Sequence, residues 1–379
     1  MAHQSPDSQL QSAFITRFPR EVRDKIYLEL WRSCGLHQHI LYHSDMRDAA
    51  RSHFCRWPCT TPFEVEDRLQ ESLDSKRLEL GIELGKRFSN VEFAQKLRSP
   101  WINHFPCGQR INRLLGLKRT LGTNAKRGAS ECSTGGPCWI NSRSNPESSS
   151  GWSPYMGMLL SCKIISSECI KSIYESTTFI FTDVTTLNLF VGFCKVPRLW
   201  QRDFQVAIPP PAFRTLGRHL ELSLQPAFST EFPCSSPTQT EERHSSLDFH
   251  GLRLDRLENL ASLAIWISAR NPAKFIDEDG TDRDQSPYNI TKLSIESLKE
   301  VLAPLSHVKN ITLSMPLADN TGPEDGYVVD SAHLKIWRRG PGDRFHIGLI
   351  PGLAEGHLQH AIYSSKDRTV SLPFIVSHS

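Results

Sequence analysis

A chain of 379 residues, 39% of them hydrophobic, is longer than a usual single domain and can bury one large core or two modest ones. Its 44 Lys and Arg residues nearly balance 41 Asp and Glu residues, so the formal net charge of +3 excludes a polycation that binds phosphate backbones with its whole surface. Residues 1–10 lack the basic start and apolar core of a secretory signal, and no apolar run approaches the roughly 20 residues of a bilayer span. We expect an intracellular protein of the cytoplasm or nucleus, without a membrane partner.

After a polar tail of residues 1–13, the first ordered element is predicted at 14–31. Pro19 suits the first turn of a helix, where its missing N–H costs no hydrogen bond, and Phe18 precedes it. The apolar residues that follow recur at four-residue spacing and are Val22, Ile26 and Leu30. The opposite, solvent-facing side is predicted to carry Arg20, Arg23, Asp24 and Lys25. This pattern predicts an amphipathic helix that either packs within its own domain or docks on a partner.

A strand is predicted at 37–43, within a stretch rich in potential metal ligands. These ligands are His37, His39, His43, His53, Cys55 and Cys59. A zinc ion needs three or four nitrogen or sulfur donors that converge tetrahedrally, but the stretch contains no Cys-x-x-Cys pair. A strand with surface histidines is the simpler interpretation. We therefore assign no metal ligand and no cofactor from the sequence, and keep zinc as the alternative.

A longer amphipathic helix is predicted over residues 63–88. The chain then contains no acidic residue from 93 to 130 and becomes rich in Ser, Gly, Pro and Asn up to residue 153, so we expect a disordered insertion at about 106–153. Charge could bring this segment to nucleic acid, with Trp101, Phe105 and Trp139 available to stack on bases. The basic residues proposed for that contact are Arg110, Arg113, Lys118, Arg119, Lys126 and Arg127.

Order is predicted to resume at about residue 159. Helical spacing of apolar residues through 162–173 predicts a helix, and alternation at 178–182 predicts a strand. Asp183 or Thr185 is a natural cap for another helix that follows at once.

Beyond the proline break at 209–211, a helical end followed by a short strand recurs three times. The strands are predicted at 220–224, 263–267 and 311–315, with further strands within 327–350 and polar loops at 226–246 and 277–287. This order suggests an α/β layer with parallel strands. The predicted fold class is therefore α+β or α/β, with one unit at 14–208 and a second at 212–379. The acidic loop 277–284 lacks the full ligand pattern of a calcium loop.

Two motifs resemble a known family. Phe18-Pro19-Arg20-Glu21-Val22 resembles the opening helix of an F-box, which begins with Leu-Pro-x-Glu-Ile. Together with Leu159-Leu160-x-Cys162-Lys163-x-Ile165 and Ile173-Tyr174-Glu175-Ser176-x-x-Phe179-x-Phe181, it resembles a large fungal F-box-like family that is catalogued as a domain of unknown function. The resemblance implies an N-terminal helix packed on a central helix, and docking on a Skp-type adaptor of a cullin ubiquitin ligase. The resemblance covers residues 14–31 and 156–193, with the strand predicted at 220–224 as a third element, and the rest of the chain has no match to that family.

The sequence contains none of the phosphate-binding, hydrolase or metalloprotease motifs that would indicate a reaction, so we do not expect an enzyme. The leading hypothesis is a protein-interaction module that recruits substrates to a cullin ubiquitin ligase. Its docking helix would use Phe18, Pro19, Val22, Ile26 and Leu30. The alternative is a nucleic-acid-associated protein that acts through residues 96–127. An unrecognised hydrolase is the third hypothesis.

Overall fold

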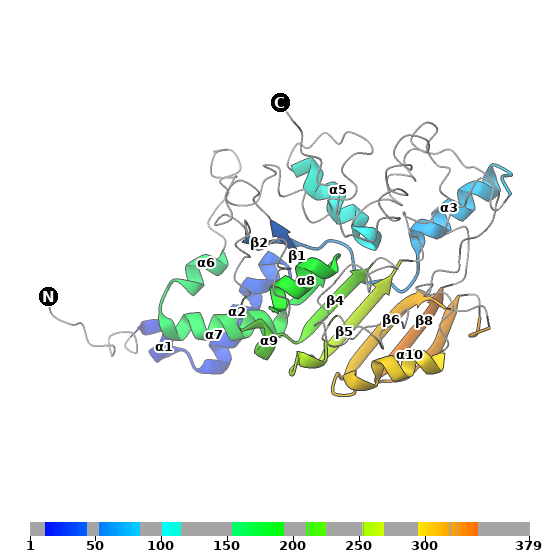
Figure 1. Cartoon of the computed structure of the whole chain (residues 1–379). Helices are drawn as coiled ribbons and strands as arrows, with labels where there is room; N and C mark the ends of the chain where they lie inside the picture. Colours follow the sequence, from blue (N-terminus) through cyan, green and yellow to red (C-terminus); the bar gives the residue numbers. More distant parts are fainter. Residues whose placement is uncertain are drawn as a thin grey trace, which may run out of the picture.

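The computed structural model describes residues 12–43, 53–83, 101–114, 154–192, 210, 212–224, 252, 254–268, 295–317, 320–323 and 325–339. Within these ranges the chain forms one mixed sheet with helices on both of its sides (Figure 1). This architecture confirms the expected mixture of α and β structure. In the described part of the chain, no helix combines the length and apolarity that a bilayer crossing requires.

The sheet contains eight described strands in the order β2-β1-β3-β4-β5-β6-β8-β7. Their bounds are β1 His37–His43, β2 His53–Pro58, β3 Thr178–Phe181, β4 His219–Leu224, β5 Ser262–Ile267, β6 Asn310–Pro316, β7 Gly326–Asp330 and β8 Leu334–Arg339. The edge strands β2 and β7 run antiparallel to their neighbours, whereas the six strands between them are parallel. These six follow the chain order without a reversal, so the described sheet lacks the switch point at which doubly wound folds bind cofactors.

The leucine-rich side of the sheet forms the main core. Alternate residues of β4, β5 and β6 point to this side and pack with residues of α8, α9, α10 and two short 3-10 helices, η10 and η12. These helices span Val184–Val191, Phe213–Leu216, Ile295–Leu302, Leu254–Arg256 and Ala303–Leu305. They share one face because right-handed crossovers between parallel strands that advance in one direction all cross on the same side. Each fully buried leucine here contributes roughly 1.5–3 kcal/mol.

A second apolar cluster lies where the N-terminal helices meet. It joins α1 (Ala13–Arg17), α2 (Arg20–Cys34), α6 (Pro154–Leu159) and α7 (Lys163–Ser176) around the buried residues Tyr27, Trp31, Ile165 and Cys169. The Trp31 indole N–H donates to Ser172 Oγ at 3.0 Å, which fixes α2 against α7. Gly35 then takes φ +87°, a conformation that glycine favours, and turns the chain directly from α2 into β1.

The helix predicted at 63–88 is shorter in the structure. It spans Arg68–Glu79 as α3, with the Asp67 carboxylate accepting a hydrogen bond from the Gln70 backbone N–H at 3.1 Å. The preceding residues lie on the sheet instead, because Ser314 donates to the Val65 carbonyl and Arg339 Nη1 lies 3.3 Å from Asp67 Oδ2. These contacts hold residues 63–67 out of the helix. The end of the predicted range, beyond residue 83, lies outside the described residues.

The predicted start of the disordered insertion, at about residue 106, is wrong. Residues Ile102–His104 form a 3-10 helix, η3, and Phe105–Leu114 form α5, which lies on the same side of the sheet as α3 (Figure 1). Cys107 and Ile111, one helical turn apart, are buried with Leu41 of β1 and Trp101. This apolar contact orders residues 102–114, although the charge and polar composition of the segment had indicated disorder. Residues 115–153 lie outside the described part.

The central strands β4, β5 and β6 are therefore buried on both sides, and the side of the sheet under η3 and α5 is polar. Its buried strand residues include Glu221, Ser223, Ser314 and Arg339. The Arg339 guanidinium stacks over the Trp266 ring with its central carbon 4.0 Å from the ring centroid. Strands from both predicted units, 14–208 and 212–379, form this one sheet, since β3 pairs with β4.

Candidate functional site

One side of α2 presents apolar side chains to solvent. Phe18 is 41% exposed, and Val22 and Ile26 are each 38% exposed. Pro19 is also exposed, whereas Leu30 is half-buried and packs on the cluster around Trp31. Three of the five residues of the predicted docking helix thus form an outward apolar face at four-residue spacing.

The opposite side of α2 is fixed by Glu168 of α7. Arg23 donates to both carboxylate oxygens of Glu168, from Nε at 2.9 Å and from Nη2 at 2.6 Å. The Tyr27 hydroxyl donates to Oε2 at 2.8 Å, and Arg20 Nη1 lies 2.8 Å from Oε1. Arg23 was predicted on the solvent-facing side and is buried instead, because its partner carboxylate lies 145 residues away in the sequence. The helix is therefore held through a charged contact as well as an apolar one.

The electrostatics of this contact favour its ionised form. The hydrogen bonds from Arg23 lower the pKa of Glu168 to about 2, although burial opposes the change. The same hydrogen bonds, which Arg23 donates to Glu168, raise the pKa of Arg23. Burial and the bond to Glu168 raise the pKa of Tyr27, so the phenol stays protonated and continues to donate.

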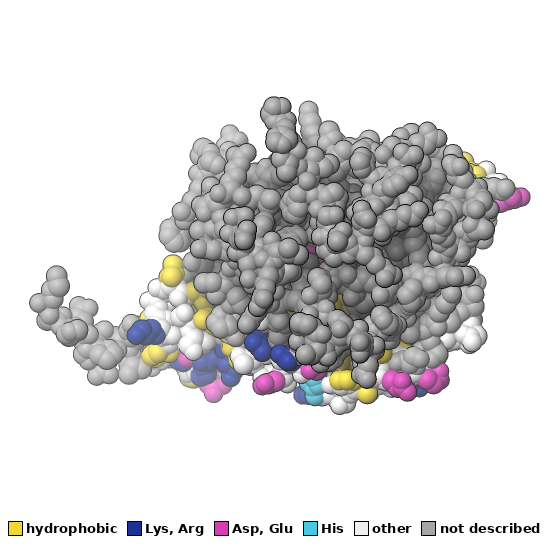
Figure 2. All heavy atoms as spheres, in the orientation of Figure 1, with side chains coloured by type: hydrophobic (Ala, Val, Ile, Leu, Met, Phe, Trp, Pro, Cys, Tyr) yellow, Lys and Arg dark blue, Asp and Glu magenta, His cyan; other side chains and the backbone are white. Residues whose placement is uncertain are grey.

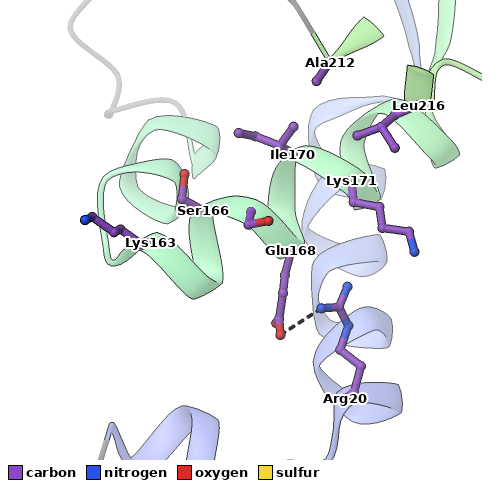
Figure 3. Close-up of a pocket in the computed structure, with 9 residues that line it drawn as sticks. Arg20, Lys163, Ser166, Glu168, Ile170, Lys171, Ala212 and Leu216 are labelled. Atoms are coloured by element: carbon purple, nitrogen blue, oxygen red, sulfur yellow. Dashed lines mark ion pairs between the residues drawn. The ribbon is translucent and has the colours of Figure 1, made fainter. Parts of the chain in front are cut away.

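A surface depression lies beside this contact, between α2, α7 and α9 (Figure 3). Figure 3 shows Arg20 reaching across to Glu168, with Ala212 and Leu216 at the end away from Arg20 and Lys171 between them. Glu168 is the one acidic residue among the described lining residues, and its oxygens already accept hydrogen bonds from Arg23 and Tyr27. The end of the molecule that carries α1, α6 and α7 displays apolar and basic side chains together (Figure 2).

A compact group of two histidines and two cysteines lies on the polar side of the sheet. The group is formed by His39, Cys59, His104 and Cys107, whose potential ligand atoms all lie within 4.8 Å of one another. Cys59 Sγ lies 3.5 Å from His104 Nδ1 and 3.6 Å from Cys107 Sγ. We call these four residues the His–Cys cluster.

Three short segments bring the His–Cys cluster together. His39 is in the middle of β1, between β2 and β3, and its side chain is fully buried. Cys59 follows the end of β2, and its backbone N–H donates to the His37 carbonyl at 2.8 Å. His104 and Cys107 are three residues apart across the junction of η3 and α5, a spacing that places two side chains on one face of a helix.

The chain around His104 adopts a tight path. Ile102 has φ +53°, an uncommon backbone conformation for a β-branched residue. A Cβ at Gly108 would lie 2.3 Å from Cδ1 of Trp101, so only glycine lets α5 approach this ring. The Trp101 ring in turn contacts the His39 ring edge-on, with centroids 5.0 Å apart. Close packing thus positions both histidines.

The His–Cys cluster contains strongly perturbed groups. Burial disfavours the charged form of His104, but hydrogen bonds with Cys107 and Glu221 outweigh it and raise its pKa to about 9. The hydrogen bond from Cys59, with further bonds from His104, His39 and Thr61, lowers the pKa of Cys107 despite burial. Burial lowers the pKa of His39, which therefore stays neutral. A thiolate and a neutral imidazole are the forms that bind a metal ion, so Cys107 and His39 already have the required form, whereas His104 would have to lose a proton on binding.

The sequence candidates for a metal site are only partly present in the His–Cys cluster. His39 and Cys59 belong to it, whereas His37, His53 and Cys55 do not, and the side chain of His43 lies outside the described residues. Sequence reasoning missed His104 and Cys107 because they lie 45 and 48 residues after Cys59, in the basic segment. The pair His104-x-x-Cys107, with two potential metal ligands three residues apart, was the signal in the sequence that could have identified them.

The residues proposed for nucleic acid are not gathered into a site that the structure describes. Arg110 is exposed on α5, and Arg113 belongs to α5 although its side chain is outside the described part. Lys118, Arg119, Lys126 and Arg127 also lie outside it. Trp101, predicted to be available for stacking on bases, is buried against His39.

No family model matches the chain, and no curated protein or solved structure matches it either.

Proposed function

We propose that the chain is a protein-interaction module that docks a partner on the outer face of α2. The observation that carries this proposal is the exposure of Val22 and Ile26 on one side of α2, with Phe18 exposed just before the helix begins, while the other side of α2 is fixed. An apolar side chain that is exposed without a partner contributes little to folding, whereas burial against a partner removes it from water.

The mode of docking supported by this face is helix against helix. When a helix docks in a groove or against another helix, apolar side chains at four-residue spacing provide its anchors. The buried contacts of Arg23, Tyr27 and Trp31 hold α2 in place before binding, so little ordering entropy would be lost. The resemblance of Phe18-Pro19-Arg20-Glu21-Val22 to the start of an F-box supports a Skp-type adaptor as the partner, with the chain recruiting substrates to a cullin ubiquitin ligase.

The test is affinity purification of the tagged full chain, with mass spectrometry of bound proteins. We expect Skp-type and cullin subunits with wild type and their loss with Ile26→Asp. Leu78→Asp is the matched control, because Leu78 is 80% exposed on α3, away from α2, and the charge introduced is the same. Absence of these subunits from the wild-type sample, or equal loss in both variants, would contradict the proposal.

A further inference from the structure

We propose that the His–Cys cluster is a structural zinc site in which His39, Cys59, His104 and Cys107 are the four ligands. The proposal rests on the positions of these side chains in the structure and is independent of the docking face on α2.

The distances in the His–Cys cluster already approach those of a zinc tetrahedron. With Zn–S near 2.3 Å and Zn–N near 2.0–2.1 Å, tetrahedral geometry places two sulfurs about 3.8 Å apart and a sulfur and a nitrogen about 3.6 Å apart. The Cys59–Cys107 sulfur distance is 3.6 Å, and the distance from Cys59 Sγ to His104 Nδ1 is 3.5 Å. All the ligand atoms lie within 4.8 Å of one another, so small side-chain rotations would complete the set.

His39 provides independent support for a ligand. Its side chain is fully buried, yet neither ring nitrogen meets the geometry of a full hydrogen bond with a described residue, and the polar group that it faces is the Cys107 sulfur. Buried polar atoms are nearly always paired, because burial without a partner loses the hydrogen bond to water. A metal ion between His39 and the two sulfurs would accept the lone pair of one ring nitrogen.

Glu221 orients His104 for the same role. Its carboxylate oxygen Oε1 lies 2.7 Å from Nε2 of His104, and both side chains are almost fully buried. Metal-binding histidines usually donate their second ring N–H to a carboxylate or carbonyl, which fixes the ring and increases its basicity. With Nε2 bound to Glu221, Nδ1 is the atom that faces the sulfurs of Cys59 and Cys107.

Groups around the sulfurs can support thiolates. The Thr60 backbone N–H donates to Cys107 Sγ at 3.4 Å, and the Thr61 backbone N–H donates to Cys59 Sγ at the same distance. The Thr61 hydroxyl lies 3.2 Å from Cys107 Sγ. Cys59 Sγ lies 3.0 Å from the Thr61 carbonyl oxygen and 3.6 Å from Cys107 Sγ, so the Cys59 thiol proton is shared between these two acceptors. Zinc binding would release this proton and the Nδ1 proton of His104 to solvent.

The ligand set favours zinc in a structural role. Two thiolates and two imidazoles match the tetrahedral sulfur–nitrogen sites that hold zinc, and four protein ligands leave no position for a substrate. The ion would connect β1, the turn after β2, and the start of α5, and Glu221 would link that connection to β4. It would thus fix the polar side of the sheet beneath η3 and α5.

The test is the zinc content of the full chain, purified under reducing conditions without chelator. We expect about one zinc ion per chain in wild type and its loss in Cys107→Ser and in His104→Ala. Cys169→Ala is the matched control, because Cys169 is equally buried but belongs to the cluster around Trp31, and it should keep its zinc. Zinc retained in both ligand variants would place the ion elsewhere and overturn the proposal.

Because a ligand variant can fail to fold, wild type provides a second measurement. The reduced, metal-free chain is titrated with Co²⁺, and tetrahedral binding with thiolate ligands should give intense d–d bands and a thiolate charge-transfer band. Subsequent Zn²⁺ should remove both. Absence of these bands, or a Cys59–Cys107 disulfide in protein freshly isolated under non-oxidising conditions, would refute a zinc site.

Discussion

The contact between Arg23 and Glu168 gives the sharpest stability prediction. Replacing Glu168 by Gln keeps the size of the side chain but removes the charge, so Arg23, 8% exposed, is left without its carboxylate. The pKa of Glu168 falls from an ordinary 4.5 to about 2 in the folded chain. That difference, at about 1.36 kcal/mol per unit, corresponds to about 3 kcal/mol of stability. Breaking a buried pair by removing one partner costs about 3–5 kcal/mol in other proteins, which agrees.

The sign of the pH dependence follows from the lowered pKa of Glu168. A carboxyl with a depressed folded pKa contributes its full stability above the unfolded value of 4.5 and loses it as the pH falls toward 2. The free energy of unfolding, measured by urea denaturation, should therefore differ between wild type and Glu168→Gln by about 3 kcal/mol at pH 7. By pH 4 the difference should be smaller by about 1 kcal/mol, because unfolded wild type then binds a proton at Glu168 that the folded state does not, and this proton uptake favours unfolding.

A matched control separates this buried pair from ordinary surface charge. Glu175 pairs with Arg218 at 2.8 Å, but Arg218 is half-exposed, so Glu175→Gln should cost less than about 1 kcal/mol. Equal losses for Glu168→Gln and Glu175→Gln would refute the reasoning. A loss for Glu168→Gln that is the same at pH 7 and pH 4 would also refute it, since the charge would then contribute nothing.

Three further changes test other parts of the structure. Phe213→Ala should lower the free energy of urea unfolding by about 3–5 kcal/mol, because the ring is 1% exposed and packs 4.9 Å from the rings of both Phe179 and Phe190. Asp183→Ala should cost about 1 kcal/mol in the same assay, since its carboxylate caps α8; no loss would show that the cap is unimportant. Glu221→Leu should weaken zinc binding about 10–100-fold in a competition titration, while the Co²⁺ spectrum keeps its tetrahedral bands; unchanged affinity would deny Glu221 a positioning role.

The strands of the C-terminal half could be predicted because their pattern is local. Leu220, Leu222 and Leu224 alternate along one strand, and that alternation identifies the buried face without knowledge of the rest of the chain. The same alternation places Glu221 and Ser223 on the other face. The polar character of that face does not indicate that it is buried, but η3 packs against β4 and covers it.

The orientation of α2 could not be predicted for a related reason. The apolar stripe runs from Val22 and Ile26 at one edge, through Leu30, to Tyr27 and Trp31 at the other edge, so periodicity alone allows either edge to face the core. The choice is made by Glu168, which accepts hydrogen bonds from Arg23 and Tyr27 across more than 140 residues of sequence. A charged residue on a helix therefore indicates a solvent-exposed face only when no distant part of the chain provides a buried partner of opposite charge.

The His–Cys cluster shows the same dependence on topology at a larger scale. His39 lies in the first strand of the parallel series, and Glu221, which orients His104, lies two strands further along the sheet and 182 residues later in the chain. Only the pairing of β1 with β3 and of β3 with β4 brings these strands together. Since β1 follows α2 directly through Gly35, an ion at His39 would also fix the C-terminal end of α2. Removing zinc should therefore loosen β1 first, whereas Ile26→Asp should leave the metal in place.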